Sequence, residues 1–349
     1  MMIDEVDSEF RVVGGEADVS PVALAVEFAD PVLEKSVRVG LDAIEAALHD
    51  AVESGDEFVT AAARHLVEAG GKRFRPMVSV LAAHFGDPSR PEIMPAAMVC
   101  EITHLATLYH DDVMDEASVR RGAESANARW DNTVAILTGD FLFSRASNIL
   151  ADLGPYAVRL QARTFERLVI GQIRETVGPR DGVDPIDHYL GVLADKTGSL
   201  IATAAEFGAH YAGVSDDVVD RLRIFGEQIG VAFQLSDDIL DIASESAQSG
   251  KTPGTDLREG VATLPVLYAL RSSDVGGDRL RSLVSRPLPD DAEHAEALRL
   301  LRASHAMEEA RATLRSYADT ARSTLAGLPD VPARAAFEAL TELVIARTG

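Results

Sequence analysis

Two aspartate clusters with the same spacing are the residues best suited to chemistry. Asp-Asp-x-x-Asp occurs at 111–115 and at 237–241, each time late in a stretch whose apolar residues recur every three or four positions. That period predicts a helix, and residues four apart on a helix share one face, with Cβ atoms about 5–6 Å apart. Because the carboxylates repel one another and the C-terminal end of a helix is itself negative, each cluster needs a compensating cation.

The ligand chemistry of the clusters indicates which cation. They offer hard oxygen ligands without a cysteine or histidine set, which favours Mg²⁺ over zinc or copper. Mg²⁺ keeps several waters and bridges carboxylates to substrate phosphates, so we expect a phosphorylated small molecule as the ligand. A single acidic pentapeptide is usually a solvated helix face, but two copies within apolar helices argue against that explanation. The predicted metal ligands are Asp111, Asp112, Asp115, Asp237, Asp238 and Asp241.

Basic residues supply the second half of the pattern. The segment GGKRFRP at 70–76 places three cations in a glycine-opened turn before a helix whose start is marked by proline. Such a turn can cradle a phosphate, although a basic helix cap is the simpler explanation of this segment alone. Arg120 and Arg121 directly follow the first aspartate cluster, where a metal-bound diphosphate would project. Lys196, Thr197 and Lys251 are further candidates for binding it.

The elements that must position these residues are predicted to be almost entirely helical. From Pro31 onward apolar residues recur at helical spacing, as in Leu33, Val37, Val39, Leu41, Ile44 and Leu48. Glycine and proline pairs mark the helix ends, and no Gly/Ser-rich or Pro-rich linker divides the chain. We therefore expect an all-α protein, with a flexible lead at 1–28 and one large helical domain at 29–349.

Composition excludes several classes of protein. The 349 residues carry a formal net charge of −23, which repels a nucleic-acid backbone, so we expect no nucleic-acid partner. Cys100 has no other cysteine to pair with, which suits a reducing compartment. The acidic N-terminal segment has neither the basic nor the apolar region of a signal peptide, and no apolar run reaches bilayer length. We expect a cytoplasmic protein that associates with a membrane at most transiently.

Four separated motifs together resemble the trans-isoprenyl diphosphate synthases, the polyprenyl synthetase family. They are GGKRFRP, HLATLYHDDVMDEASVRRG, ADKTGSL, and FQLSDDILD followed by GKTPGTDLREGVATLP, in the order of the family and at similar spacing. The resemblance covers most of residues 60 to 270. The sequence departs from the family at Val261, where many relatives have a basic residue. The resemblance therefore implies less about the closing loop than about the aspartate clusters. The family implies a helical bundle of the isoprenoid synthase type with a central substrate cavity.

The resemblance also implies roles for individual residues. The aspartate clusters would hold several Mg²⁺ ions, with Mn²⁺ as the expected substitute, against an allylic diphosphate. Residues that match the isopentenyl diphosphate pocket are Lys72, Arg75, His104 and Arg121. Residues that match the surroundings of the allylic diphosphate are Arg120, Lys196, Thr197, Gln234 and Lys251. Among these, the residues expected to act in catalysis are Asp111, Asp112, Lys196, Thr197 and Gln234.

The implied reaction is ionisation of the allylic diphosphate, attack by isopentenyl diphosphate and loss of a proton, which lengthens the chain by five carbons. In this family the fifth residue before the first cluster bears on product length, and here it is the small Ala106. A small residue at this position resembles the long-chain branch of the family, so we expect a product longer than twenty carbons. The family also implies a homodimer, whose product is available to a membrane enzyme.

Three alternative functions would use part of the same residues. A terpene cyclase normally replaces the second aspartate motif and needs no second diphosphate pocket. A non-catalytic partner of another synthase would be expected to lack part of the metal or basic set, which is complete here. A metallophosphohydrolase would use His110 beside Asp111 but requires further histidine ligands. Phe74, Phe85, Phe141, Phe143 and Phe233 are assigned to packing.

Overall fold

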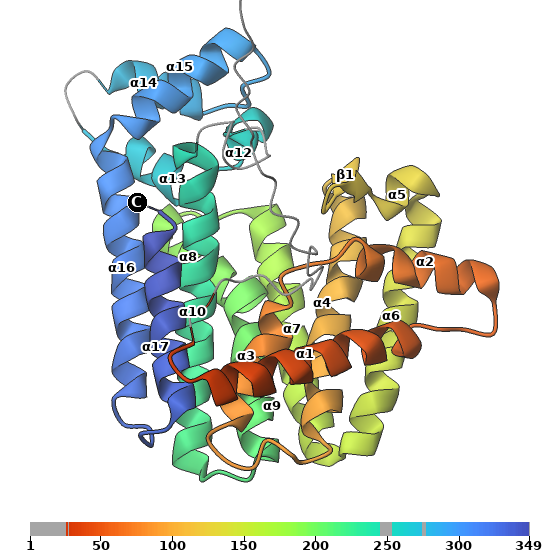
Figure 1. Cartoon of the computed structure of the whole chain (residues 1–349). Helices are drawn as coiled ribbons and strands as arrows, with labels where there is room; N and C mark the ends of the chain where they lie inside the picture. Colours follow the sequence, from red (N-terminus) through yellow and green to blue (C-terminus); the bar gives the residue numbers. More distant parts are fainter. Residues whose placement is uncertain (1–25, 27, 245–252, 274–276, 349) are drawn as a thin grey trace, which may run out of the picture.

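The computed structural model describes residues 26, 28–244, 253–273 and 277–348. Long helices dominate these residues (Figure 1), which confirms the all-α prediction. The predicted flexible lead lies outside the described residues except at Val26 and Phe28, which both pack against the core. Lys251 also lies outside them.

The first part of the chain forms seven helices and one small hairpin within the described residues. Strand β1 (Val119–Arg120) pairs antiparallel with β2 (Ala123–Glu124), directly after the first aspartate cluster. The helices are α1 (Pro31–Ala51), α2 (Glu57–Glu68), α3 (Phe74–Ala83), α4 (Ile93–Met114), α5 (Ala126–Arg129), α6 (Asn132–Leu153) and α7 (Pro155–Val177).

The described residues of the second part of the chain form a run of helices that includes one π-helical turn, η1 (Ala194–Gly198). This turn joins α8 to α9 without a loop. The helices are α8 (Pro185–Leu193), α9 (Ser199–Tyr211), α10 (Asp216–Ala243), α12 (Thr255–Glu259), α13 (Leu264–Arg271), α14 (Asp278–Val284), α15 (Asp291–Arg302), α16 (His305–Leu325) and α17 (Pro332–Ala346).

Aspartate caps begin several helices. The carboxylate of Asp30 accepts hydrogen bonds from the first backbone N–H groups of α1 at 2.8 Å, and Asp56 caps α2 in the same way. Each cap satisfies donors that a helix leaves unpaired at its start, which contributes about 1 kcal/mol. Within α1 the predicted apolar stripe is buried except for Val39, which is 59% exposed.

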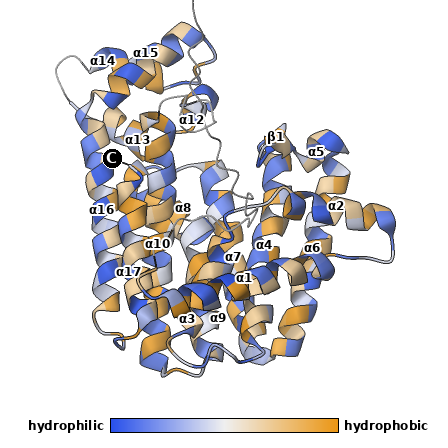
Figure 2. Ribbon diagram, in the orientation of Figure 1, coloured by the Kyte–Doolittle hydropathy of each residue, from blue (hydrophilic) through white to orange (hydrophobic). Residues whose placement is uncertain are grey.

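The aspartate clusters lie on two central helices. Helix α4 packs against α1, α3, α6 and α9, and helix α10 packs against α9, α16 and α17. Most helices carry both apolar and polar residues around their surface (Figure 2), as expected of amphipathic helices. In contrast, α4 and α9 bury residues on most of their faces and form the interior of the molecule. None of the helices in the described residues combines the length and apolarity needed to cross a membrane.

Candidate active site

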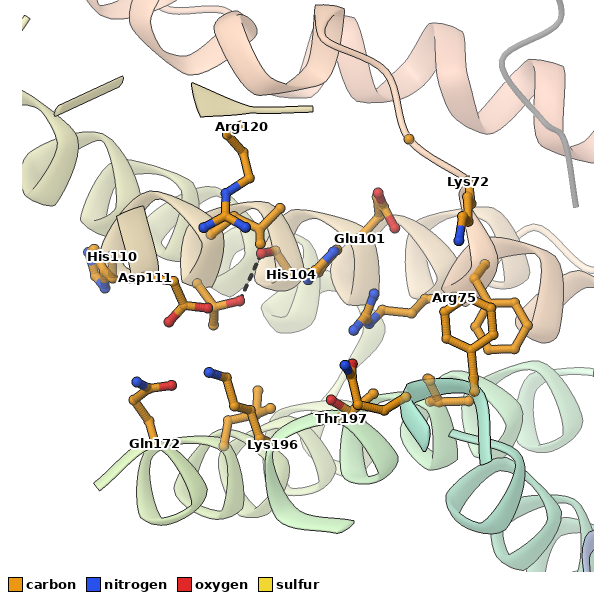
Figure 3. Close-up of a pocket in the computed structure, with 18 of the residues that line it drawn as sticks. Lys72, Arg75, Glu101, His104, His110, Asp111, Arg120, Gln172, Lys196 and Thr197 are labelled. Atoms are coloured by element: carbon orange, nitrogen blue, oxygen red, sulfur yellow. Dashed lines mark hydrogen bonds between the residues drawn. The ribbon is translucent and has the colours of Figure 1, made fainter. Parts of the chain in front are cut away.

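One pocket of about 540 Å³ collects most of the residues predicted from the sequence. Its walls come from the segment 70–76 and α4 on one side, and from α7, η1 and α10 on the other. In Figure 3, Asp111 on the α4 wall faces Gln172 and Lys196 on the opposite wall. The predicted residues that line the pocket are Lys72, Arg75, His104, Asp111, Asp115, Arg120, Arg121, Lys196, Thr197, Gln234 and Asp237.

The first aspartate cluster divides its carboxylates between the pocket and the interior. Asp111 and Asp115 line the pocket, whereas Asp112 is fully buried and accepts a hydrogen bond from Arg120 Nε at 2.5 Å. Burial raises the pKa of Asp111 and of Asp112 above the ordinary value. The other oxygen of Asp112 is buried and has no hydrogen-bond partner among the described residues.

The second aspartate cluster divides in the same way. Asp237 lines the pocket, while Asp238 is buried and accepts hydrogen bonds from the hydroxyl of Tyr189 and, at 3.1 Å, from Gln234 Nε2. Burial raises the pKa of Asp238 to about 7. Asp241 accepts weak hydrogen bonds from the backbone at the start of α12. The pocket lining does not include Asp112, Asp238 or Asp241.

The segment 70–76 owes its shape to Arg73, one of the three cations that the sequence places in the basic turn and a residue that also lines the pocket. Arg73 adopts a left-handed backbone conformation with φ of 45° and is 3% exposed. Its guanidinium binds both carboxylate oxygens of Glu45 at 2.6 and 2.7 Å and one oxygen of Glu101 at 3.0 Å. This network fixes the turn between Lys72 and Arg75, whose side chains line the pocket.

Arg121 connects the β-hairpin to the same segment. It lies close over Gly71, where a Cβ would come within 2.9 Å of the guanidinium carbon. Gly71 also has φ of 153°, so a side chain there is disfavoured twice. One guanidinium nitrogen of Arg121 donates to the carbonyl oxygens of Leu66, at 3.1 Å, and Gly70. Arg121 therefore contributes both to the pocket lining and to the position of the basic turn.

Lys196 and Thr197 lie in the π-helical turn η1. Such turns are rare and often occur at functional sites. Lys196 Nζ is 2.6 Å from a carboxylate oxygen of Glu175, and the neighbouring Asp195 is held by Arg167 and Arg174 of α7, each at 3.0 Å. These ion pairs anchor the turn to α7.

Two glycines allow the neighbouring helices to pack closely against the π-helical turn. A Cβ on Gly171 of α7 would lie 2.9 Å from the backbone nitrogen of Lys196. A Cβ on Gly230 of α10 would lie 2.9 Å from the Cα of Gly198. Both distances are shorter than real side chains tolerate, so glycine at these positions lets α7 and α10 approach η1 from two sides.

The two histidines of α4 have different surroundings. Burial, together with the charges of Arg75 and Arg121, lowers the pKa of His104 well below its usual value, so this pocket residue is neutral. His110 also lines the pocket, and its Nε2 lies 3.0 Å from the carbonyl oxygen of Ile136 and 3.5 Å from Oδ1 of Asp140. No group of three or more His, Cys, Asp or Glu side chains in the described part of the chain is close enough to form a metal site by itself. This arrangement offers no support for the metallophosphohydrolase alternative.

The pocket has an apolar end that the sequence did not reveal. Phe143 of α6 and Phe165 of α7 are in edge contact, with ring centres 4.6 Å apart, and both line the pocket. Phe74 and Phe233, stacked at 4.8 Å, also line it. Phe74, Phe143 and Phe233, which the sequence analysis assigns to packing, thus line the pocket as well. Other lining residues that the sequence did not single out are Glu101, Thr107, Leu108, Met114, Phe165, Leu168, Val169, Gln172 and Ile201.

Ala106 occupies a different place from the one expected. It is fully buried and is not among the residues that line the pocket. Its carbonyl oxygen faces Gly139 of α6, where a Cβ would lie 3.1 Å away. Gly139 thus permits close packing of α6 on α4 at this point. The influence of Ala106 on product length stays a prediction.

The chemistry of the pocket carboxylates fits a divalent metal. Asp111 and Asp115 come from α4 and Asp237 comes from α10. A divalent ion held by these oxygens would take further ligands from water and phosphate, as Mg²⁺ commonly does. The buried, unpaired oxygen of Asp112 indicates that this end of α4 also accepts additional positive charge or water.

The comparisons with known proteins agree with this geometry. Residues 56–301 match the family model for polyprenyl synthetase. Nonaprenyl diphosphate synthase of Mycobacterium tuberculosis is 51% identical over 329 residues, which are 94% of this chain and 98% of that protein.

Solved structures give the same result for the fold. Geranylgeranyl pyrophosphate synthase from Corynebacterium glutamicum, complexed with calcium and isoprenyl diphosphate, superposes with a TM-score of 0.84 at 48% identity. The match covers 93% of this chain and 100% of that chain. Decaprenyl diphosphate synthase from Rhodobacter capsulatus gives a TM-score of 0.83 at 32% identity, covering 91% and 99%. The four motifs, the helical fold and the matched length together establish that the chain belongs to the polyprenyl synthetase family and is a prenyltransferase.

Proposed function

We propose that the chain condenses isopentenyl diphosphate with an allylic prenyl diphosphate to form a trans-polyprenyl diphosphate. The observation that carries this proposal is a single pocket lined both by carboxylates of the two aspartate clusters and by lysine and arginine side chains. A diphosphate fits such a lining because metal ions neutralise it on the carboxylate side while lysine and arginine bind its remaining oxygens.

The cations form two groups around the pocket. Lys72, Arg75 and Arg121 come from the basic turn and the hairpin, and we assign them to isopentenyl diphosphate. Lys196 and Thr197 come from η1 on the other wall, and we assign them to the allylic diphosphate together with Arg120. Neutral His104 lies on α4 beside the first group, where it can donate a hydrogen bond. Two groups of cations suit a reaction with two diphosphates.

We propose that several Mg²⁺ ions, replaceable by Mn²⁺, are held by Asp111, Asp115 and Asp237. When bound, the metal neutralises the charge that develops on the departing diphosphate and so promotes ionisation of the allylic carbon–oxygen bond. The protein's own contribution is to hold the two substrates side by side, to bind the diphosphate oxygens through its cations, and to exclude water. Leu108, Phe143 and Phe165 provide an apolar surface for the isoprenoid chain.

We propose a long product, beyond twenty carbons. The nonaprenyl synthase similarity favours this, whereas the similar geranylgeranyl synthase structure belongs to a producer of shorter chains. The lining offers the chain several aliphatic side chains beyond Asp111, including Leu108, Leu168 and Val169. Gas or liquid chromatography of the dephosphorylated products gives the chain length directly.

We also propose a homodimer formed through α6 and α7. These helices expose a set of large apolar side chains, which soluble monomers seldom gather on one face: Ile136, Leu137, Val158, Val169, Ile170, Ile173 and Val177. Light scattering after gel filtration should give twice the chain mass. Ile173→Asp should shift the protein toward monomer, whereas Val39→Asp on α1, an equally exposed apolar residue, should leave the dimer intact.

A cytoplasmic location is proposed from the state of Cys100, a buried free thiol. The long apolar product would then be handed to an enzyme in the membrane, with transient association of the synthase at its surface. Fractionation of cells that express the full chain tests both parts, because the enzyme should appear mainly in the soluble fraction.

The decisive experiment is an assay of purified enzyme with Mg²⁺, isopentenyl diphosphate and allylic primers of several lengths. A prenyl synthase elongates the primer only when both substrates are present. A terpene cyclase would convert the allylic substrate alone, and a non-catalytic partner would convert neither. Lys72→Ala or Arg75→Ala should raise the KM for isopentenyl diphosphate more than that for the primer, and equal effects on both KM values would argue against two separate sites.

A further inference from the structure

The first aspartate of the second cluster is already paired with a cation of the protein. Arg347, directly after α17, places Nη2 2.5 Å from Oδ1 of Asp237. In Figure 1 the end of α17 lies beside α10, the helix that carries this aspartate. The contact joins positions 110 residues apart, and Arg347 was not among the residues predicted from the sequence.

The same guanidinium is held by an aromatic ring. The carbon of the Arg347 guanidinium lies 5.0 Å from the ring centre of Phe233, within the range of a cation–π contact. Phe233 precedes Asp237 by four residues, so the ring and the carboxylate lie on one face of α10. Phe233 is itself stacked on Phe74. Arg347 therefore has a fixed position over this face, with 21% of its side chain exposed.

A second cation lies close to the same carboxylate. Lys72 Nζ is 3.9 Å from Asp237 Oδ1 and 4.9 Å from the ring centre of Phe233. Asp237 is thus neutralised by two side chains in the structure, and the shorter contact is that of Arg347. A divalent ion bound to the same oxygen would be a third positive charge within a few ångströms, and like charges at that separation repel strongly in a partly buried site.

From these contacts we propose that Arg347 is an internal counter-ion that competes with the metal for Asp237 and must leave this carboxylate before a divalent ion binds there. The inference rests on the proposed function, because it assumes that Asp237 is a metal ligand. The pair keeps an otherwise repulsive carboxylate neutral while no substrate is present. Metal then loads efficiently only when another acceptor takes over the guanidinium, and a diphosphate in the neighbouring pocket has suitable oxygens.

The structure contains a feature that favours such an exchange. The second terminal nitrogen of Arg347, Nη1, is buried and has no hydrogen-bond partner among the described residues. A guanidinium has two parallel donors that match phosphate oxygens, and pairing with a single carboxylate oxygen leaves part of that capacity unused. Moving from Asp237 to a diphosphate would satisfy both nitrogens. The arrangement predicts that metal affinity of the substrate-free enzyme is limited by Arg347.

The test measures binding of Mn²⁺ alone to the substrate-free full chain, by calorimetry and by the electron paramagnetic resonance signal of free Mn²⁺. Arg347→Met keeps an apolar stem over Phe233 and removes the charge, and it should tighten Mn²⁺ binding about tenfold, the equivalent of one charge-assisted hydrogen bond. Arg347→Lys should stay close to the wild type. Arg334→Met is the matched control on α17, because Arg334 forms its ion pairs with Asp330 and, at 3.2 Å, with Glu338, and not with the aspartate cluster.

Asp237→Asn separates failure of this inference from failure of the proposed function. If Asp237→Asn weakens Mn²⁺ binding but Arg347→Met does not tighten it, Arg347 does not compete and the inference is overturned while the metal site stands. If Asp237→Asn changes nothing in the wild type or in Arg347→Met, the second cluster does not bind the metal, and the proposed function loses that site. If Arg347→Met does not fold, Arg347→Gln gives the same removal of charge with a polar side chain.

A thermal readout checks the result without any enzyme assay. Ligand binding raises the melting temperature according to the ratio of free metal to its dissociation constant. At equal Mn²⁺ concentration the melting temperature of Arg347→Met should therefore rise more than that of the wild type. The extra rise should disappear in the double variant Arg347→Met with Asp237→Asn. An equal rise in all variants would contradict competition at Asp237.

Discussion

Arg120 donates a hydrogen bond to Asp112 across 2.5 Å, so the second carboxylate of the first cluster is bound by a cation of the protein and turned away from the pocket lining. Asp111, one residue earlier, faces the pocket. Adjacent residues of a helix point about 100° apart, since 3.6 residues make one turn. We therefore expect the two neighbouring aspartates to serve different purposes, with Asp111 on the substrate side and Asp112 orienting Arg120.

Substitution of the two aspartates should separate these purposes. Asp111→Asn should lower kcat by about 10²-fold or more and raise the Mg²⁺ concentration needed for half-maximal rate, because a pocket carboxylate is lost. Asp112→Asn should leave that Mg²⁺ requirement within about twofold and lower activity through a misplaced Arg120. Steady-state rates over a Mg²⁺ series measure both effects. A Mg²⁺ requirement raised equally in both variants would show that Asp112 acts as a ligand.

Arg73 is expected to act through its neighbours. Arg73→Met leaves Glu45 and Glu101 without their partner and should lower the free energy of unfolding by about 3–5 kcal/mol. Where the variant still folds, the KM for isopentenyl diphosphate should rise more than kcat falls, because the turn that positions Lys72 and Arg75 loosens. Arg73→Lys should restore part of both. Arg38→Met, which breaks an exposed pair with Glu34 on α1, is the control and should change neither KM.

Gly171→Ala should disturb the π-helical turn from a distance. The added Cβ would lie 2.9 Å from the backbone nitrogen of Lys196, so α7 or the turn must move, at about 1–3 kcal/mol. We expect the KM for the allylic substrate to rise with little change for isopentenyl diphosphate. Gly182→Ala in the loop before α8 has nothing within 4 Å of the new Cβ, although its positive φ makes that change mildly unfavourable as well. A wild-type allylic KM in Gly171→Ala would mean that the turn adapts freely.

Stability should fall on the acid side partly because of His104. Burial lowers the pKa of this histidine in the folded chain, so at pH below about 6.5 the unfolded state binds a proton that the folded state does not. Stability is fully present above that pH and decreases as the pH falls toward the folded-state pKa. Urea denaturation at pH 8 and pH 5 should show a smaller difference for His104→Asn than for the wild type. Equal differences would show that His104 titrates normally when folded.

Product length can be tested at two places in the molecule. The resemblance to the family predicts that Ala106→Phe shortens the products, and the full burial of Ala106 also predicts overpacking, which should lower the free energy of unfolding by about 1–3 kcal/mol. Phe143→Ala opens the apolar end of the pocket at the Phe143–Phe165 contact and should lengthen the products. Chromatography of the product series distinguishes the two. An unchanged series in folded, active Phe143→Ala would exclude this aromatic pair as the limit.

The helices and the main pocket residues were accessible from the sequence because local rules govern them. Aspartate caps and the apolar period predict helices such as α1. The spacing of Asp111 and Asp115 places them on one face, as the pocket lining confirms. The same geometry also argues that Asp112 points elsewhere, but its partner Arg120 comes from a hairpin whose fold depends on long-range contacts.

Other parts of the site depend on contacts that a local pattern does not contain. The π-helical turn requires Gly171 and Gly230, from two different helices, to lie against it. Arg347 reaches Asp237 from the far end of the described chain. Arg73 resembled a third phosphate ligand in sequence, and only the positions of Glu45 and Glu101 reveal it as a buried support. In each case the tertiary arrangement, rather than residue type, decides the role.

The π-helical turn between α8 and α9 also bears on how this chain can change in length. A π turn contains one residue more than the α-helical turn it replaces, so deletion of a single residue within 194–198 would restore a regular helix. Because the π turn absorbs the extra residue, α8 and α9 would keep their relative orientation after the deletion, and α9 would keep its contacts with α3, α4 and α10. The widened turn that carries Lys196 and Thr197 would be lost, however, and these side chains would leave their positions in the pocket. Natural variation in length should therefore be confined to exposed connections such as 178–184, and absent from this turn.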